Sequence, residues 1–348
     1  MSFVRLLTLT LVLGGLPWLA ACCRKTAPPV VARADFHGWE SIALRNPVAE
    51  AVVVPAIGRI MRFGLRVGGG DAPPGPFWSH PNLTPTLGAD ENGWINYGGD
   101  KTWPAPQSAW PAIAGRGWPP PKTFDAVPYA MSIEGNRVRL VSPVDPLYGI
   151  RVTRAISIDP AKPILTVETT YDKTQGAPVR VGVWSITQLE APDRLFVRLP
   201  ERSSFPGGYA LLLPAPPRDL RTDGRLLSLA RDPTQKTMIG SDGDALLWIG
   251  RGLDLLIENV TVEPADAAAR WPDGVHAQVY TSPGGSESYV ELELLGRLRD
   301  LRPGERTSMT VRYTLAGRVE TDPDAEARTV FGPGARLKAA ESPAGTAP

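Results

Sequence analysis

The stretch Thr310-Val-Arg-Tyr-Thr-Leu315 alternates between polar and apolar side chains, which places Val311, Tyr313 and Leu315 on one face of a strand. The same period of two residues recurs in further runs, at residues 137–141, 151–158, 164–171, 179–187, 253–262 and 289–295. Turn-forming pairs separate these runs, namely Asp159-Pro160, Gln175-Gly176, Asp242-Gly243 and Pro303-Gly304. Helical periodicity is confined to residues 322–329, so about a dozen strands without intervening helices predict an all-β, mainly antiparallel sandwich.

The composition excludes several classes of protein. The chain has 348 residues, with 37 Lys and Arg against 36 Asp and Glu, and 43% of its residues are hydrophobic. This near-neutral balance argues against a nucleic-acid partner, because nucleic-acid binders present a basic face. The hydrophobic content is sufficient for a packed core, although Gly and Pro are frequent. Since only two Cys and three His are present, we expect no metal site, and no motif indicates a cofactor.

The first 22 residues resemble a bacterial lipoprotein signal. Arg5 precedes an apolar run, residues 6–16, that is too short to span a bilayer as a helix. The tetrapeptide Leu19-Ala-Ala-Cys22 resembles a lipobox, whose cysteine is lipidated and becomes the N-terminus after cleavage. The resemblance implies a membrane anchor of acyl chains such as palmitate at Cys22. An ordinary secretory signal peptide is the alternative.

The signal divides the chain into four expected parts. These are a signal peptide (1–21), a lipidated N-terminus with its tether (22–35), one β-sandwich domain (36–316), and a C-terminal extension whose end is disordered (317–348). The residue after Cys22 is not Asp, which in the lipoproteins that this signal resembles implies the outer membrane, facing the periplasm. No second apolar stretch of the sequence has the length of a membrane span.

Residues 68–128 are rich in Gly, Pro and Trp and show little strand pattern, which predicts a long functional loop. Its most distinctive segment is Gly-Gly-Asp-Lys-Thr-Trp-Pro-Ala-Pro-Gln, residues 98–107. Polar groups and an indole face in and beside this segment suit the hydroxyl rim and the C–H face of a sugar: Asn96, Asp100, Lys101, Gln107 and Trp103. The alternative is a satellite core of tryptophans, with Asp100 and Lys101 as a structural ion pair.

Several segments occur in the order that is typical of one bacterial family. They are Pro-Ala-Ile-Gly-Arg-Ile-Met-Arg-Phe (55–63), the segment 98–107, Trp-Ser-Ile-Thr-Gln (184–188), Tyr-Val-Glu-Leu-Glu-Leu-Leu-Gly (289–296) and Leu-Arg-Pro-Gly-Glu (301–305). Together they resemble a lipoprotein family with a domain of unknown function, itself similar to the galactose mutarotase (aldose 1-epimerase) superfamily. The resemblance covers most of residues 36–316. It implies a β-supersandwich whose concave face binds carbohydrate, with the long loop crossing that face.

Mutarotases combine a carboxylate base near the C-terminus with a histidine acid on a central strand. The segment that begins with Trp184 lies where that histidine is expected and contains none. Glu291 and Glu293 share a strand face with Tyr289 and are the candidate bases, with an ordinary solvated face as the alternative. His276 is a candidate acid, with a packed imidazole as the alternative.

We therefore predict one carbohydrate-binding pocket in which the loop meets the C-terminal strand. The expected ligand-binding residues are Asn96, Asp100, Lys101, Trp103, Gln107, Trp184, Lys236 and Tyr289, although Lys236 also fits an ordinary surface charge. An aldose epimerase-type enzyme with a C-terminal Glu as base is the alternative function. A structural envelope protein without a ligand is a further alternative, and the sequence indicates no oligomeric state.

Overall fold

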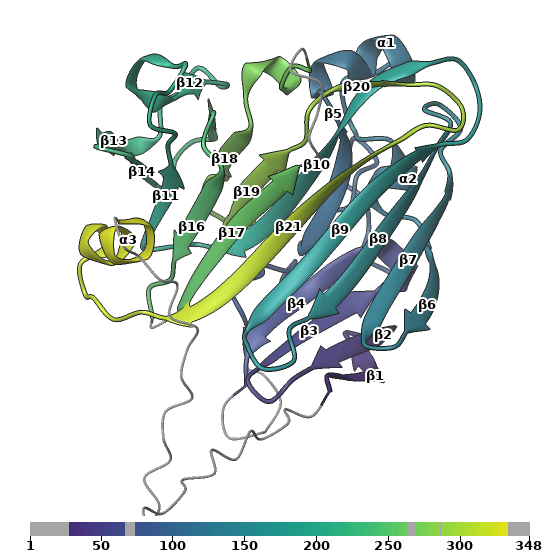
Figure 1. Ribbon diagram of the computed structural model, residues 1–348, viewed down its shortest axis with the longest axis horizontal. Helices are drawn as coiled ribbons and strands as arrows, with labels where there is room; N and C mark the ends of the chain where they lie inside the picture. The colour runs from purple at the N-terminus through teal and green to yellow at the C-terminus, as the bar shows by residue number, and fades with distance from the viewer. Residues whose placement is uncertain (1–27, 67–73, 253, 263–268, 286, 333–348) are drawn as a thin grey trace, which may run out of the picture.

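The computed structural model describes residues 28–66, 74–252, 254–262, 269–285 and 287–332, whose path Figure 1 traces. The predicted signal peptide and Cys22 lie outside the described residues. The end of the C-terminal extension, residues 333–348, also lies outside them.

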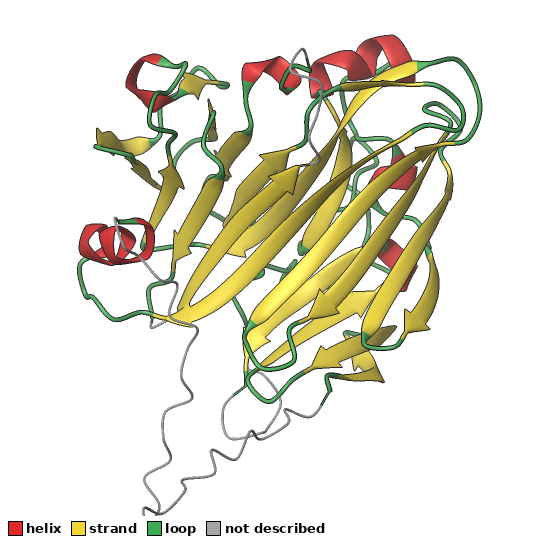
Figure 2. Ribbon diagram, viewed as in Figure 1, coloured by secondary structure: helices red, strands yellow, loops and turns green. Residues whose placement is uncertain are grey.

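Two antiparallel sheets pack face to face (Figures 1 and 2). The eleven-stranded first sheet has the order β1 (Val30–Phe36), β2 (Trp39–Arg45), β3 (Ala49–Val54), β4 (Arg59–Leu65), β5 (Asp100–Ala105), β10 (Val179–Glu190), β19 (Tyr289–Leu295), β18 (Ala277–Thr281), β15 (Thr237–Ser241), β12 (Ala210–Leu211), with β20 (Arg299–Leu301) also paired to β10. The ten-stranded second sheet has the order β13 (Arg218–Asp223), β14 (Leu226–Ala230), β11 (Arg194–Arg198), β16 (Ala245–Ile249), β17 (Asp254–Val262), β21 (Arg306–Gly317), β9 (Ile164–Lys173), β8 (Ile150–Ile158), β7 (Arg137–Val144), β6 (Ala130–Glu134).

Short helices lie in the connections between the strands and after the last strand (Figure 2). They are the α-helices α1 (Trp110–Ala114), α2 (Lys122–Asp125) and α3 (Pro323–Phe331) and the 3-10 turns η1 (Pro55–Ile57), η2 (Gln107–Ala109), η3 (Pro206–Gly208) and η4 (Pro272–Gly274). Within the described ranges, none of these helices combines the length and the apolar character that a bilayer crossing requires.

The predicted all-β, mainly antiparallel class is confirmed. Within the described residues, every run with the two-residue period falls in a strand, because alternate side chains of such a run can enter the space between the sheets. Val183 and Leu292 enter it from the first sheet, and Val152 and Val311 are buried on the second. These side chains belong to one continuous hydrophobic core, so the two sheets are held as one unit.

Two boundaries differ from the sequence-based expectation. Residues 30–34, expected in the tether, form most of β1 and pair with β2. Residues 100–105, expected in the long loop, form β5 at the centre of the first sheet, where they pair with residues 182–187 of β10. The Gly and Pro content concealed this strand, because both residue types weaken the usual strand pattern. Helix α3 falls where the sequence showed helical periodicity, and it packs against the second sheet through Ala327.

Candidate functional site

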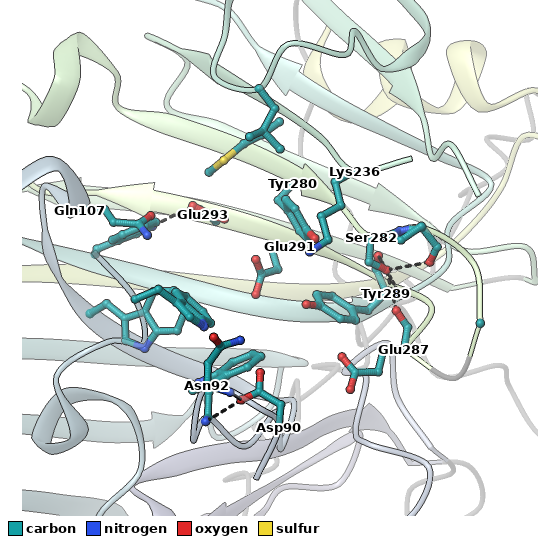
Figure 3. Close-up of a pocket in the computed structure, with 18 of the residues that line it drawn as sticks. Asp90, Asn92, Gln107, Lys236, Tyr280, Ser282, Glu287, Tyr289, Glu291 and Glu293 are labelled. Carbon is teal, nitrogen blue, oxygen red and sulfur yellow. Dashed lines mark hydrogen bonds between the residues drawn. The ribbon is translucent and has the colours of Figure 1, made fainter. Parts of the chain in front are cut away.

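A cleft of about 680 Å³ opens on the face of the first sheet that points away from the second sheet (Figure 3). Strands β5, β10, β15, β18 and β19 supply its floor. Its rim includes residues from the segments 90–94, 107–118 and 282–287. Figure 3 shows Glu291 and Tyr289 pointing into the opening between Asp90 on one side and Lys236 on the other.

The floor is organised by β19, on which Tyr289, Glu291 and Glu293 all line the cleft. They share one face because side chains along a strand alternate between its two sides. Val290 and Leu292 point to the opposite face and are fully buried. The sequence pattern predicted this division of β19, and the structure places its polar row in the cleft rather than on an open solvated face.

The two glutamates have different environments. The Glu291 carboxylate accepts a hydrogen bond from Nζ of Lys101 at 3.2 Å, and the two groups form an ion pair. Burial lowers the pKa of Lys101, and the Glu291 carboxylate opposes this shift. Burial raises the pKa of Glu293 well above its usual value, and the negative charge of Glu291 raises it further. Burial and the neighbouring charge therefore favour the protonated form of Glu293 beside the Glu291–Lys101 ion pair, a division that many acid–base sites share.

An aromatic wall rises beside these glutamates. Trp94, Trp103, Trp118 and Trp184 line the cleft, and the Trp103 ring meets the other three edge-on at centroid distances of 5.5 to 6.5 Å. The indole of Trp184 donates a hydrogen bond to Glu293 at 2.9 Å. The same tryptophans also pack on a buried neighbour, because Trp110 is fully buried and contacts the Trp103 ring at a centroid distance of 5.7 Å. The tryptophans thus form both a satellite core and a cleft wall.

Asp125 of α2 fixes this wall. Its carboxylate accepts hydrogen bonds from the indole N–H of Trp94 at 3.0 Å and of Trp103 at 2.9 Å. The guanidinium of Arg59 forms an ion pair with the same carboxylate at 2.7 Å. Arg59 is the first residue of β4 and is fully buried. The sequence analysis did not single out Asp125, because only the fold brings α2 against β5.

Asp100 does not lie in the cleft, which corrects the expectation for this residue. It is fully buried between the two sheets, where it pairs with Arg154. Its carboxylate also accepts hydrogen bonds from the hydroxyls of Tyr313 at 2.6 Å and Thr187 at 3.3 Å. The reason is alternation: Asp100 and Lys101 are neighbours in a strand, so they point to opposite faces and do not form the ion pair considered for them.

The segment before β5 turns sharply at two glycines. Gly98 and Gly99 both have positive φ, at 91° and 71°. A Cβ atom on Gly99 would lie 2.5 Å from the carbonyl oxygen of Ile60, so a side chain has no room there. This close approach brings the turn against β4 and sets the start of β5.

Three further predicted residues lie at or near the rim. Gln107 and Lys236 are exposed and line the cleft, and the amide of Gln107 donates to the carbonyl oxygen of Gly117 at 3.2 Å. Asn96 is buried just behind the rim and donates to Glu287 at 2.9 Å. Asn96 therefore acts through Glu287 rather than on the cleft surface.

His276 lies outside the cleft lining, which corrects its assignment as a candidate acid. Its ring stacks on Trp271 with a centroid distance of 3.9 Å and an interplanar angle of 18°. Burial lowers its pKa to about 4, so the imidazole is neutral at pH 7. His276 directly precedes β18, and its buried ring is the packed imidazole that was the alternative to a catalytic acid.

Sequence reasoning missed the other side of the floor. Tyr280 of β18 lies directly across from Glu291, and Gln278 lies across from Glu293. Gln188 of β10 flanks Glu291 from the other side. Gln278 and Tyr280 are two residues apart, so the sequence alone could place both on one face of a strand. Only the pairing of β18 with β19 shows that they lie beside Glu293 and Glu291. Across the described ranges, no group of His, Cys, Asp and Glu is arranged to hold a metal ion.

The comparison with solved structures identifies the architecture. A galactose mutarotase-like protein from Lactobacillus casei superposes with a TM-score of 0.51 and 10% identity, covering 79% of this chain and 99% of that one. A GalM/aldose epimerase homologue from C. elegans gives a TM-score of 0.51 and 10% identity, covering 83% and 100%. The fold is the galactose-mutarotase-like β-sandwich. No protein-family model and no curated protein sequence matches the chain.

The fold is assigned from three-dimensional similarity, and identities near 10% show the fold alone. The chemistry of the cleft, and not the fold, indicates what the protein does.

Proposed function

We propose that this protein binds a carbohydrate in the cleft beside β19. The observation that supports the proposal is the combination of the indole wall with the floor formed by Tyr289, Glu291 and Glu293. A sugar presents C–H faces that suit an aromatic ring and hydroxyl groups that suit carboxyl and amide groups. Solved proteins of the same fold named as galactose mutarotase-like or aldose epimerase homologues are consistent with such a ligand.

Titration of the protein with mono- and oligosaccharides, followed by tryptophan fluorescence, tests this proposal. Trp118 is half-buried in the wall, so Trp118→Ala removes ring surface without emptying the core. We expect a loss of affinity of about three- to tenfold, the contribution of one aromatic face. Ile133→Ala, which changes an exposed apolar residue of β6 outside the cleft lining, is the control. Failure of every tested sugar to bind the wild type would favour the structural alternative.

A second candidate function is epimerisation of an aldose, which the raised pKa of Glu293 beside Glu291 favours. In this scheme Glu291 removes the proton of the anomeric hydroxyl and Glu293 protonates the ring oxygen, which opens the hemiacetal. The two side chains lie two residues apart on one strand, so both approach the sugar from the same side. This one-sided placement is why binding, rather than turnover, is our first proposal.

The enzyme and the binding protein are separated by anomer exchange measured by NMR. For an enzyme, Glu293→Gln keeps the shape of the side chain but removes its proton, so exchange slows by about 10²–10⁴-fold while affinity is retained. For a binding protein, the wild type does not accelerate exchange above the buffer rate.

We also propose that the protein is a lipoprotein anchored through Cys22 in the outer membrane, facing the periplasm. The support is the apolar run followed by Leu19-Ala-Ala-Cys22, together with the segment 98–107 that resembles a lipoprotein family. Cys22→Ser should abolish labelling with a fatty acid and leave the signal peptide unprocessed. A Cys22→Ser protein that is still labelled and processed would exclude this anchor.

A further inference from the structure

The cleft is acidic although the chain as a whole is nearly neutral. Asp90, Glu287 and Glu291 line it beside Glu293, whose raised pKa favours the neutral form, and among the described lining residues Lys236 is the one cation. Lys101, buried below the floor, balances Glu291. Asp90 and Glu287 at the rim still outnumber Lys236, so a ligand enters through a region of negative potential.

Unpartnered amide groups lie on the cleft side of the first sheet. Within the described part of the chain, Oε1 of Gln278 and both amide atoms of Gln188, an acceptor and a donor, are buried without a hydrogen-bond partner. Gln278 lies across from Glu293 and Gln188 across from Glu291, so both amides lie on the cleft face of the sheet beside the lining glutamates. Buried polar atoms in native proteins are nearly always paired with protein groups, water or a ligand, so the two free carbonyl oxygens favour a neighbour that donates hydrogen bonds.

The indole N–H groups and the ammonium group of Lys101 beside the floor are already used as donors. The indole N–H groups of Trp94 and Trp103 donate to Asp125, and that of Trp184 donates to Glu293. Nζ of Lys101 donates to Glu291. A ligand group that only donates hydrogen bonds therefore fits the floor better than one that only accepts them.

The aromatic surfaces favour a positive charge as well. Nζ of Lys101 already lies 4.9 Å from the centre of the Trp103 ring, a distance typical of cation–π contact. Because Asp125 fixes the edges of Trp94 and Trp103 by their N–H groups, their faces are held in place. Tyr280 and Tyr289 add two further rings beside Glu291.

We propose that the cleft selects a glycan with free ammonium groups, such as a sugar whose amine carries no acetyl group, over neutral and anionic glycans. This inference rests on the proposed carbohydrate binding and specifies the class of ligand. An ammonium group donates three hydrogen bonds and accepts none, which matches unpartnered acceptors and carboxylates. A phosphate or uronate group would meet Asp90 and Glu287 with like charge and has no arginine fork to bind among the described lining residues.

The test compares two tetrasaccharides of equal length, one of β-1,4-linked glucosamine and one of β-1,4-linked N-acetylglucosamine, by calorimetry at pH 6. We expect the amine form to bind at least about tenfold more tightly, the effect of one charge-assisted hydrogen bond. The preference should shrink as salt is raised, because rim charges are screened. Glu287→Gln should reduce the preference, whereas Glu168→Gln, an exposed change on β9 outside the cleft lining, should preserve it.

The outcomes separate this inference from the proposed function. Equal affinity for both tetrasaccharides, or tighter binding of the acetylated form, would overturn the ammonium preference and leave carbohydrate binding in place. Tighter binding of a uronic acid tetrasaccharide would also overturn it. Absence of binding by all three would overturn both proposals. If Glu287→Gln and Glu168→Gln reduce the preference for the amine form equally, the preference does not arise in the cleft.

Discussion

Asp100 and Arg154 form an ion pair that is enclosed between the two sheets, with both side chains almost completely buried. Asp100→Ala leaves the Arg154 guanidinium uncompensated in the core, so we expect the free energy of unfolding to fall by about 3–5 kcal/mol. Urea denaturation measures this loss. The double variant Asp100→Leu/Arg154→Leu should be more stable than the single variant, because it removes both charges. A single variant of wild-type stability with weaker sugar binding would return Asp100 to the site.

His276 gives a pH-dependent contribution to stability. Its pKa is about 4 in the folded protein and 6.5 in the unfolded chain, mainly because burial disfavours the charged ring. The unfolded chain therefore binds more protons between these values, so stability is complete above pH 6.5 and is lost as the pH falls toward 4. The shift corresponds to about 3 kcal/mol.

The variant His276→Phe tests this contribution, because a phenyl ring can keep the stack on Trp271 but does not titrate. The unfolding free energies of the two proteins should converge above pH 7, and the variant should gain stability relative to the wild type as the pH falls to 4. The nearby charges of Asp242, Asp244 and Arg297 are common to both proteins and cancel in the difference. Parallel pH profiles would show that His276 is charged or exposed.

At the scale of single elements, β19 and β5 show what the sequence could and could not predict. The two-residue period of β19 was sufficient to place Glu291 and Glu293 with Tyr289 on one face. The same rule separates Asp100 from Lys101, but it applies only once the segment is known to be a strand. Pro104 stands opposite Val183 inside the central pairing, a position that proline rarely occupies, so local propensity favoured a loop.

Helix α3 covers the outer face of the second sheet at β11 and β16. Ala327 is fully buried there with Phe196, Leu247 and Ile249. Ala327→Asp would bury an unpaired charge, so we expect a loss of about 3 kcal/mol in the free energy of unfolding. Thr329→Asp, an exposed change on the same helix, should cost about 1 kcal/mol or less. Equal and small losses would mean that α3 detaches from the sheet in solution.

At the scale of the whole molecule, the strand order was beyond the reach of the sequence pattern. Lys101 and Glu291 meet across 190 residues of chain because β5 and β19 both pair with β10. Side-chain periodicity identifies strands and their faces, but the pairing partners of a strand depend on packing throughout the sandwich. The cleft-lining residues of β15 and β18 were therefore found only from the fold, whereas the class of fold followed from the strand pattern alone.

The strand order also predicts that the sandwich folds as one cooperative unit. The connection between β9 and β10, residues 174–178, divides the chain near its middle. Central pairings cross this division in both sheets, since β10 pairs with β5 and β9 pairs with β21. Each half alone would expose the edges of these central strands and half of the core, so we expect residues 1–175 and 176–348 to remain unfolded when expressed separately.

Circular dichroism of the separate halves and of their mixture tests this expectation. The intact chain should unfold in a single transition, with near-UV dichroism and tryptophan fluorescence following the same curve. Mixing the halves should restore the near-UV signal of the tryptophan cluster, because Trp103 and Trp184 come from different halves and meet only in the complete sheet. Two transitions in the intact chain, or a half that folds alone with a cooperative transition, would show two domains where the pairing of β5 with β10 requires one.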